Sequence, residues 1–376
     1  MTRARSRSRT APGLRSALEG IRVGAAGRDA NPGFPKAPFQ SLADAGVLAF
    51  PVPDSVSESG RRASFSDEWR VLRAVAAADG SVGRILDGHL NGTERLAALA
   101  PEPLRSEDLE AVASGELLLG VWGADPIPGE GDPARLTHIT RGLAIEGVKT
   151  FCSGSTGLDR ALVAVRGSDG SGPPLLAYVD LDGSVERDEG WFRGAGMRSS
   201  ESHRVIFHGT PVLAVLGEPG ELIREPYFSR DAVRTAVTWA GIADTAVEAA
   251  LATLAAKSGE DPDDIVSLAA GKMLAAQGTM DRWLEHASRF ADADPAASMS
   301  SFSIHLRESV ASACRTILDE AARAVGSHPF AVAGDLDRAR RDLELLLLQH
   351  RLEPALARAG RQAIRDRART EDGTNG

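Results

Sequence analysis

This 376-residue chain contains the stretch Gly194-Ala195-Gly196-Met197-Arg198-Ser199-Ser200-Glu201-Ser202. The stretch lies between a region of short strand-like runs and a region of long helical patterns. It is followed by the strand-like run Arg204–Phe207 and then by Thr210-Pro211-Val212. Other short strand-like runs precede it, and long Ala-rich helical patterns begin after about Gly220. This order of elements predicts an α+β protein in which a β region is joined to a helical region.

The β region begins near Glu116 and consists of short runs separated by turns. The turns are rich in Gly, Pro, Asp and Ser, as in Gly167-Ser168-Asp169-Gly170 and Asp182-Gly183. Short, regularly spaced strands without helices between them predict a small antiparallel barrel or sandwich. The runs are Leu117–Val121, Arg135–Thr140, Leu143–Thr150, Ala161–Val165, Leu175–Leu181 and Arg204–Phe207.

Helical patterns flank the β region on both sides. In the first third, apolar spacing predicts helices over Phe39–Val47, Ser66–Ala78 (with Gly80 as its stop signal) and Asn91–Leu99. After the β region, four longer patterns with short connections favour an antiparallel four-helix bundle. These four are Ala232–Ala256, Asp264–Ala291, Phe302–Val325 and Leu336–Ala359.

We therefore divide the chain into five parts. The start is expected to be a disordered basic tail, because Arg3, Arg5, Arg7 and Arg9 alternate with Ser and Thr. The parts are the tail 1–20, an N-terminal helical domain 21–115, a β-barrel domain 116–218, a four-helix bundle 219–364 and a second disordered tail 365–376.

Composition narrows the class of protein further. The formal net charge is -9, which argues against a nucleic-acid partner because such proteins usually carry a basic surface. The two cysteines, Cys152 and Cys314, make neither a disulfide framework nor a zinc pattern, so we expect no metal and a reducing, cytoplasmic location. No apolar run is long enough to cross a membrane, and the N-terminus lacks the hydrophobic stretch of a signal peptide.

The layout of helices, β domain and four-helix bundle resembles the acyl-CoA dehydrogenase superfamily of flavoproteins. The stretch from Gly194 to Ser202 and the strand after it resemble that superfamily's Gly-Met-Arg-x-Ser/Thr segment and following strand. The resemblance covers nearly the whole chain and implies the acyl-CoA dehydrogenase-like fold, with an N-terminal helical domain, a middle antiparallel β-barrel and a C-terminal four-helix bundle. It also implies a flavin cofactor.

Two segments resemble the flavin-contacting segments of the family. The turn Trp122-Gly123-Ala124-Asp125 is similar to the one whose backbone meets the flavin pyrimidine edge, although Ala124 stands where the family often has Thr. The segment Phe151-Cys152-Ser153 is similar to the one whose aromatic ring lies against the isoalloxazine and whose hydroxyl reaches flavin N5. A flavin site needs ring stacking and donors at these edges. The alternatives are an ordinary strand exit and a core Phe.

The last helix carries a third family feature, Arg341-Asp342-Leu343. In the common dehydrogenases the catalytic Glu follows nine residues after that Arg, and this chain has His350 there. In a minority the Glu precedes an Arg on the first bundle helix, where this chain has Val233 before Arg234. Neither carboxylate position is filled, although dehydrogenation needs a base near flavin N5.

The superfamily also contains flavin monooxygenases that lack the Glu, take reduced flavin from a partner reductase and use O2. The residues His350, His89 and Ser153 look similar to their His and Ser set, so we name these three as candidate catalytic residues. The structural alternatives are that His350 is a polar residue at the end of a helix face and that His89, on a connection between helices, forms hydrogen bonds with backbone groups.

Three functions remain open from the sequence. The first is a dehydrogenase-type oxidoreductase that acts on an acyl thioester and transfers electrons to an electron-transfer flavoprotein. The second is a two-component monooxygenase with a flavin reductase, acting on a small or natural-product substrate, and the third is a non-catalytic superfamily member. FAD is expected, with FMN possible because the segment at Lys257 lacks the family's diphosphate-binding Arg and Phe. Because Ala232–Ala256 is apolar around much of its circumference, we expect a homodimer or homotetramer.

Overall fold

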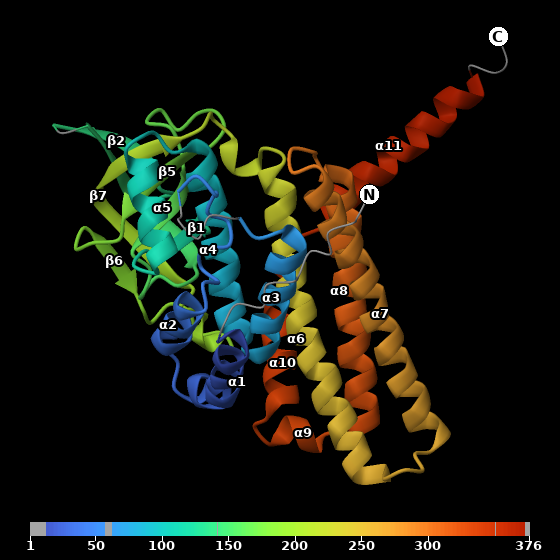
Figure 1. Cartoon of the computed structure of the whole chain (residues 1–376). Coiled ribbons are helices and arrows are strands. Elements are labelled where there is room, and N and C mark those ends of the chain that lie inside the picture. The colour runs from blue at the N-terminus through green and yellow to red at the C-terminus, as the bar shows by residue number, and fades with distance from the viewer. Residues whose placement is uncertain (1–12, 57–61, 141, 350, 373–376) are drawn as a thin grey trace, which may run out of the picture.

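The computed structural model describes residues 13–56, 62–140, 142–349 and 351–372. Figure 1 shows a group of shorter helices (α1–α5), a curled sheet (β1–β7) and long helices (α6–α8) packed beside the first group. Helix α4 contacts the sheet while α3 contacts α6, so these two helices join the β part to the long helices. Among the described residues, no helix is both long enough and apolar enough to cross a lipid bilayer.

The N-terminal helices begin earlier than the sequence suggested. Helix α1 starts at Leu14, inside the expected tail 1–20, because Leu14, Ala17 and Ile21 recur at helical spacing and are buried. We placed the end of the predicted tail too far along the chain because the residues before this helix are rich in Arg. The helices are α1 Leu14–Ala30, α2 Lys36–Asp44, α3 Phe65–Ala78, α4 Gly80–Leu99 and α5 Leu104–Ser114.

Helix α4 is twice as long as the pattern that predicted it. Its N-cap is Asp79, whose carboxylate accepts hydrogen bonds from the backbone N–H groups of Ser81 and Val82. Gly80, which we expected to stop one helix, therefore begins the next. As a consequence, His89 lies in the middle of α4 and not on a connection between helices.

The β part is a seven-stranded curled sheet in the order β1-β4-β5-β7-β3-β2, with β6 paired to β7. Most pairs are antiparallel as predicted, but β1 runs parallel to β4. An isolated bridge between Arg135 and Arg166 brings the β2 end of the sheet back to the end of β4. The strands are β1 Leu119–Trp122, β2 Arg135–Ile139, β3 Gly142–Cys152, β4 Arg160–Val165, β5 Leu175–Asp180, β6 Val185–Asp188 and β7 His203–Leu216.

The C-terminal part contains three long helices and three shorter ones. The helix expected over Leu336–Ala359 is divided, because Pro354 cannot donate an N–H to the preceding turn and lies instead in the first turn of α11. Helix α11 extends away from the body in Figure 1 and includes residues 365–372 of the expected tail. The helices are α6 Tyr227–Ser258, α7 Asp264–Ala293, α8 Ser300–Val325, α9 His328–Ala331, α10 Asp335–Leu346 and α11 Glu353–Asp372.

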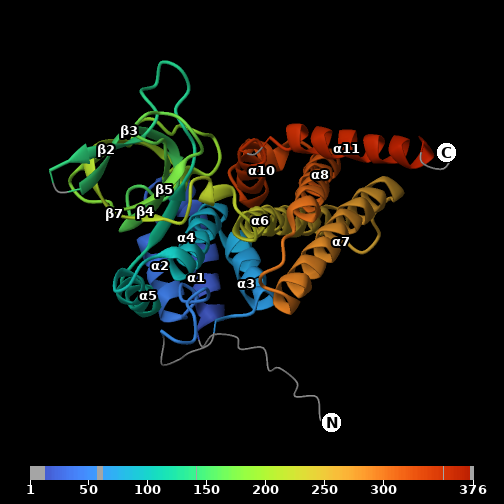
Figure 2. The same cartoon turned by 90° about the horizontal axis from the view of Figure 1, so that it is seen from above.

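Helix α6 is the centre of the helical part. Figure 2 shows it between α3 and α4 on one side and α8 and α10 on the other, and it contacts all four. Its N-terminal half is buried almost continuously from Ser229 to Ala243. This burial within one chain accounts for its all-round apolar sequence, so that sequence is not by itself a reason to expect a second copy.

The stretch from Gly194 to Ser202 packs directly against α10. The backbone N–H of Met197 donates to the Asp342 carboxylate, and Arg341 donates to the carbonyl of Ala195. Gly196 lies against the α10 backbone, where an added Cβ would be 2.1 Å from the Arg341 carbonyl oxygen. Burial, with smaller contributions from Asp79 and Asp29, raises the pKa of the enclosed Asp342 to about 7. The stretch from Gly194 to Ser202 and the segment Arg341-Asp342-Leu343 are therefore two halves of one joint between the sheet and the helices.

Because this joint leaves no room for a side chain, we predict that Gly196→Ala destabilises the protein. Overpacking of this kind costs roughly 1–3 kcal/mol, and more where backbone must move. The midpoint of urea unfolding measures the effect. Gly271→Ala is the matched control, since Gly271 lies exposed in α7 with no atom within 4 Å of its added Cβ, and it should be neutral or slightly stabilising. Equal stability of wild type and Gly196→Ala would contradict the described contact.

Candidate functional site

Strained backbone gathers where the sheet meets α4. Among the described residues, the non-glycine residues with positive φ are Phe151 (53°), Met197 (54°) and Glu201 (49°). They are brought together because Gly154 donates to the carbonyl of Ser200 and Ser155 to that of Glu201. Such conformations cost of order 1–3 kcal/mol each and concentrate at functional sites, where the surroundings hold them in place.

The positive-φ backbone at Phe151 places the aromatic ring at the surface, at the end of β3. Its side chain is 48% exposed, whereas the residues on either side, Thr150 and Cys152, are buried. Trp191 packs edge-on to the ring with centroids 4.9 Å apart, and its indole N–H donates to Glu130. The Phe151 ring is thus fixed on one side and open to a flat ligand.

The turn Gly123-Ala124-Asp125 lies beside β3. Its carbonyls face β3: Thr150 N–H donates to Ala124 O at 3.1 Å, and Lys149 Nζ donates to Gly123 O at 3.0 Å. The Lys149 ammonium also pairs with Asp125 Oδ1 at 2.9 Å, although burial lowers the pKa of Lys149. Ala124 and Asp125 are exposed residues, and within the described part of the chain their backbone N–H groups have no protein acceptor, so these groups can serve a ligand.

A chain of three hydroxyls ends at Ser153. Ser153 Oγ lies 2.9 Å from Ser202 Oγ, which lies 2.8 Å from Ser200 Oγ. The indole N–H of Trp122 donates to the Ser153 carbonyl at 3.1 Å. Trp122 is buried, so its contribution is to hold Ser153 in place. The partly buried Ser153 hydroxyl is the outer member of the chain and is oriented by the two behind it.

Like Trp122, the predicted site residues Cys152 and His89 face the protein interior. Cys152 is fully buried, and burial raises the pKa of its thiol, so it packs the sheet instead of presenting a group to a ligand. His89 is also fully buried: Leu119 N–H donates to its Nδ1, and its Nε2–H donates to the carbonyl of Leu48. Burial lowers the pKa of His89 to about 4. Both ring nitrogens are hydrogen-bonded to backbone groups, as expected if the role of His89 is structural. We therefore do not retain His89 as a catalytic residue.

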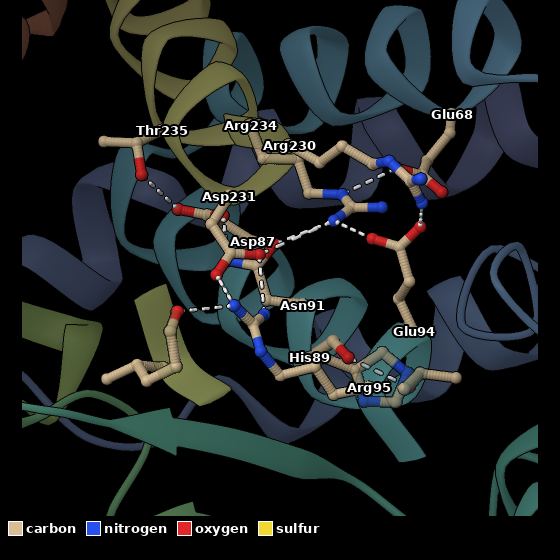
Figure 3. Close-up of polar contacts among 12 residues, drawn as sticks. Glu68, Asp87, His89, Asn91, Glu94, Arg95, Arg230, Asp231, Arg234 and Thr235 are labelled. Atoms are coloured by element: carbon tan, nitrogen blue, oxygen red, sulfur yellow. Dashed lines mark hydrogen bonds and ion pairs between the residues drawn. The ribbon is translucent and has the colours of Figure 1, made fainter. Parts of the chain in front are cut away.

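His350 lies outside the described residues, so the structure does not place the third catalytic candidate. The position of the minority Glu is described: Val233 is fully buried in α6, and the following Arg234 belongs to a buried ionic network. In Figure 3 the network joins α3, α4 and α6 through arginines and carboxylates. Among the described residues, no group of acids, histidines and cysteines could hold a metal ion.

The network's central ion pairs were not predicted from the sequence. Arg234 donates to Glu68 Oε1 at 2.7 Å and to Glu94 Oε2 at 2.8 Å. Although burial favours a neutral acid, Arg234, Arg230 and Arg62 lower the pKa of Glu94 to about 2. One feature of the sequence could have indicated these ion pairs. Glu68 lies beside Trp69 and Leu72, so a charged residue falls on the apolar face of a helical pattern.

Comparison with known proteins identifies relatives of this chain. No family model matches. A dibenzothiophene monooxygenase from Rhodococcus erythropolis is 27% identical over 223 residues, which is 56% of this chain and 50% of that protein. A second one, from Rhodococcus qingshengii, is 26% identical over the same shares. The chain thus spans about half the length of the curated relatives it matches.

Solved structures resemble the chain over almost its whole length. The FMN-bound TdsC of Paenibacillus sp. A11-2 has a TM-score of 0.80 at 21% identity, covering 94% of this chain and 96% of that one. A nitrososynthase from Micromonospora carbonacea var. africana has a TM-score of 0.80 at 22% identity, covering 94% and 95%. Methanesulfinate monooxygenase MsuC from Pseudomonas fluorescens has a TM-score of 0.77 at 20% identity, covering 94% and 96%.

The neutral, buried His89 predicts a pH dependence of stability. The folded-state pKa near 4 lies below the ordinary value of 6.5, so the unfolded chain binds the proton first as pH falls. The contribution of His89 to stability should fall as the pH drops from about 6.5 towards 4, with a slope approaching 1.4 kcal/mol per pH unit. Because Asp342, with its raised pKa, acts in the opposite direction over the same range, the His89 contribution is the difference between wild type and a His89 variant. Urea unfolding between pH 5 and 7 measures it. His89→Gln should lack this contribution, and equal slopes for the two proteins would contradict the assignment.

Proposed function

We propose that this chain, which has the acyl-CoA dehydrogenase fold, is a flavin-dependent monooxygenase and not an acyl-thioester dehydrogenase. The observation that carries the proposal is the exposed Phe151 ring, held in strained backbone beside the Ser153 hydroxyl and the free amides of Ala124 and Asp125. This combination suits one face and two edges of an isoalloxazine.

The described residues fit a flavin in a specific way. The Phe151 ring would lie against the isoalloxazine, Ser153 would donate towards N5, and the Ala124 and Asp125 amides would face the pyrimidine edge. Reduced flavin supplies the electrons that activate O2. Of the two flavins we favour FMN, since the TdsC structure contains FMN and this chain lacks the expected diphosphate-binding residues at Lys257.

The absence of the dehydrogenase carboxylate favours oxygenation. The two positions where the family places its Glu carry His350 and the buried Val233. The carboxylates on the nearby helices are engaged: Asp87 accepts from Arg84 at 2.7 Å and from Asn91 at 2.9 Å, and Glu94 is paired with arginines. None of these is a free base for removing an acidified Cα proton.

A monooxygenase of this kind needs a source of reduced flavin, so we propose a separate flavin reductase as partner. We also retain an assembly of two or four copies as a proposal. It is supported by the apolar side chains of Ile265 and Leu268, which are 80% and 60% exposed on α7.

The function is tested by comparing two reactions of the purified protein. Chemically reduced FMN is mixed with the protein, ¹⁸O2 and indole, a compound bound by TdsC, and the product is analysed for ¹⁸O by mass spectrometry. In a second assay, octanoyl-CoA is added to the FMN-loaded protein and flavin reduction is followed at about 450 nm. We expect ¹⁸O incorporation and no flavin reduction. Reduction by octanoyl-CoA without ¹⁸O incorporation would contradict the proposal.

His350 remains our proposed acid–base residue, on the strength of its position nine residues after Arg341. In the oxygenation assay, His350→Ala should lower turnover by about 10²–10⁴-fold while FMN affinity is retained. His350→Glu should also abolish oxygenation, and a gain of acyl-CoA oxidation by that variant would indicate a modified dehydrogenase. Unchanged turnover of His350→Ala would show that the His is structural.

The stacking role of Phe151 predicts a loss of flavin affinity. Phe151→Ala should weaken FMN binding roughly 10-fold, because an aromatic contact contributes about 0.5–1.5 kcal/mol beyond its buried area. Quenching of FMN fluorescence during titration measures the affinity. Phe290→Ala is the matched control, since Phe290 is 41% exposed on α7. Equal FMN affinity for the two variants would place the flavin elsewhere.

A further inference from the structure

Arg307, on α8, is a buried cation that has no polar partner among the described residues. Its side chain is only 8% exposed, and within the described part of the chain its guanidinium donates no hydrogen bond and forms no ion pair. The contact that the structure gives it is the ring of Trp239, whose centroid lies 5.5 Å from the guanidinium carbon. Burial lowers the pKa of Arg307 to about 10, which leaves it charged at neutral pH.

A buried, uncompensated guanidinium is costly and therefore unusual. The negative charge of Asp87 favours the charged form of Arg307. Asp87 is already engaged, because Arg84 and Asn91 donate to its carboxylate and Thr235 lies at 3.4 Å. The pair that Asp87 makes with Arg84 leaves Arg307 with its charge unmatched.

The surrounding network does not supply the missing negative charge. Its arginines outnumber its carboxylates: Arg62, Arg84, Arg95, Arg230, Arg234 and Arg307 face Glu68, Asp87, Glu94 and Asp231. An excess of positive charge among buried and partly buried side chains favours the binding of an anion.

One position on α4 close to Asp87 is not filled by neighbouring atoms. On α4, Ile85 faces the sheet at Gly154 and Asp87 faces α6 at Thr235. Gly88 lies between these two faces, is only partly buried, and would have no atom within 4 Å of an added Cβ. The surface of α4 at Gly88, between the sheet and α6 and on the same helix as Arg84, therefore has room for a ligand atom.

We propose that Arg307 binds an anionic group of the substrate, a carboxylate or an oxoanion of similar size, that approaches past Gly88. The inference names the substrate class of the proposed function and rests on it. Arg307 pairs with the anion while Trp239 packs against the guanidinium, and the reactive part of the substrate extends towards Ser153. A neutral substrate of the same shape would leave the buried charge unpaired and would bind less well.

The test measures the melting temperature of the flavin-free protein at constant ionic strength. Sodium benzoate, its neutral isostere benzamide, sodium phosphate and sodium chloride are compared as probes. We expect benzoate to raise the melting temperature saturably by about 2 °C or more, with benzamide and chloride without effect. A response to phosphate but not benzoate would assign the site to a phosphate group, and no response to either anion would overturn the proposal.

Variants assign the response to Arg307. Arg307→Met should lose the benzoate response and should itself melt at a higher temperature, because an unmatched buried charge is removed. Arg307→Gln provides a second neutral variant if the first does not fold. Arg323→Met, at a 72% exposed position on the same helix, is the control and should respond like wild type. A full benzoate response in Arg307→Met would overturn the proposal.

Failure of this inference can be told apart from failure of the proposed function. The anion response is read without flavin, whereas the proposed function depends on FMN binding and oxygen incorporation. A protein that binds FMN and incorporates oxygen but gives no anion response would retain its proposed function and lose the substrate class.

Discussion

The buried ion pairs of Arg234 hold three helices in one arrangement. Arg234 lies on α6 and pairs with Glu68 of α3 and Glu94 of α4, and all three side chains are at most 6% exposed. Removing one partner of such a set leaves an uncompensated buried charge, which costs about 3–5 kcal/mol. The carboxylates thus accept only one relative position of α3, α4 and α6. Apolar packing of an Ala-rich helix does not specify the relative position of the helices in this way.

From that arrangement the site follows step by step. Helix α4 reaches the sheet through His89, which binds backbone groups of Leu48 and Leu119, and through Ile85, which lies at Gly154. The end of β3 is thereby held against α4. The segment that precedes β7 is held by the joint between Gly196 and α10. Between these fixed points the backbone adopts positive φ at Phe151, and the ring is exposed.

Sequence patterns predicted the order of the three structural parts, most of the strands and the α7 and α8 helices, because apolar periodicity is a local property. The same patterns could not show that Asp79 would cap α4 at Gly80, since Gly80 reads equally well as a helix stop. They could not assign His89 either, because its two partners, Leu48 and Leu119, are distant in sequence. The segments expected to contact a flavin were named by resemblance to a family, and in the structure they lie side by side. The pairing of Glu68 and Glu94 with Arg234 depends on three helices meeting, which no local pattern contains.

The central claim is that Phe151, Ser153 and the turn Ala124-Asp125 form one flavin site. A crystal structure of the protein soaked with FMN tests it most directly. The account predicts that the isoalloxazine lies flat against Phe151, with its pyrimidine edge at the Ala124 and Asp125 amides and N5 towards Ser153. FMN bound at another place on the protein, or a Phe151 ring covered by protein side chains in the presence of saturating FMN, would contradict it.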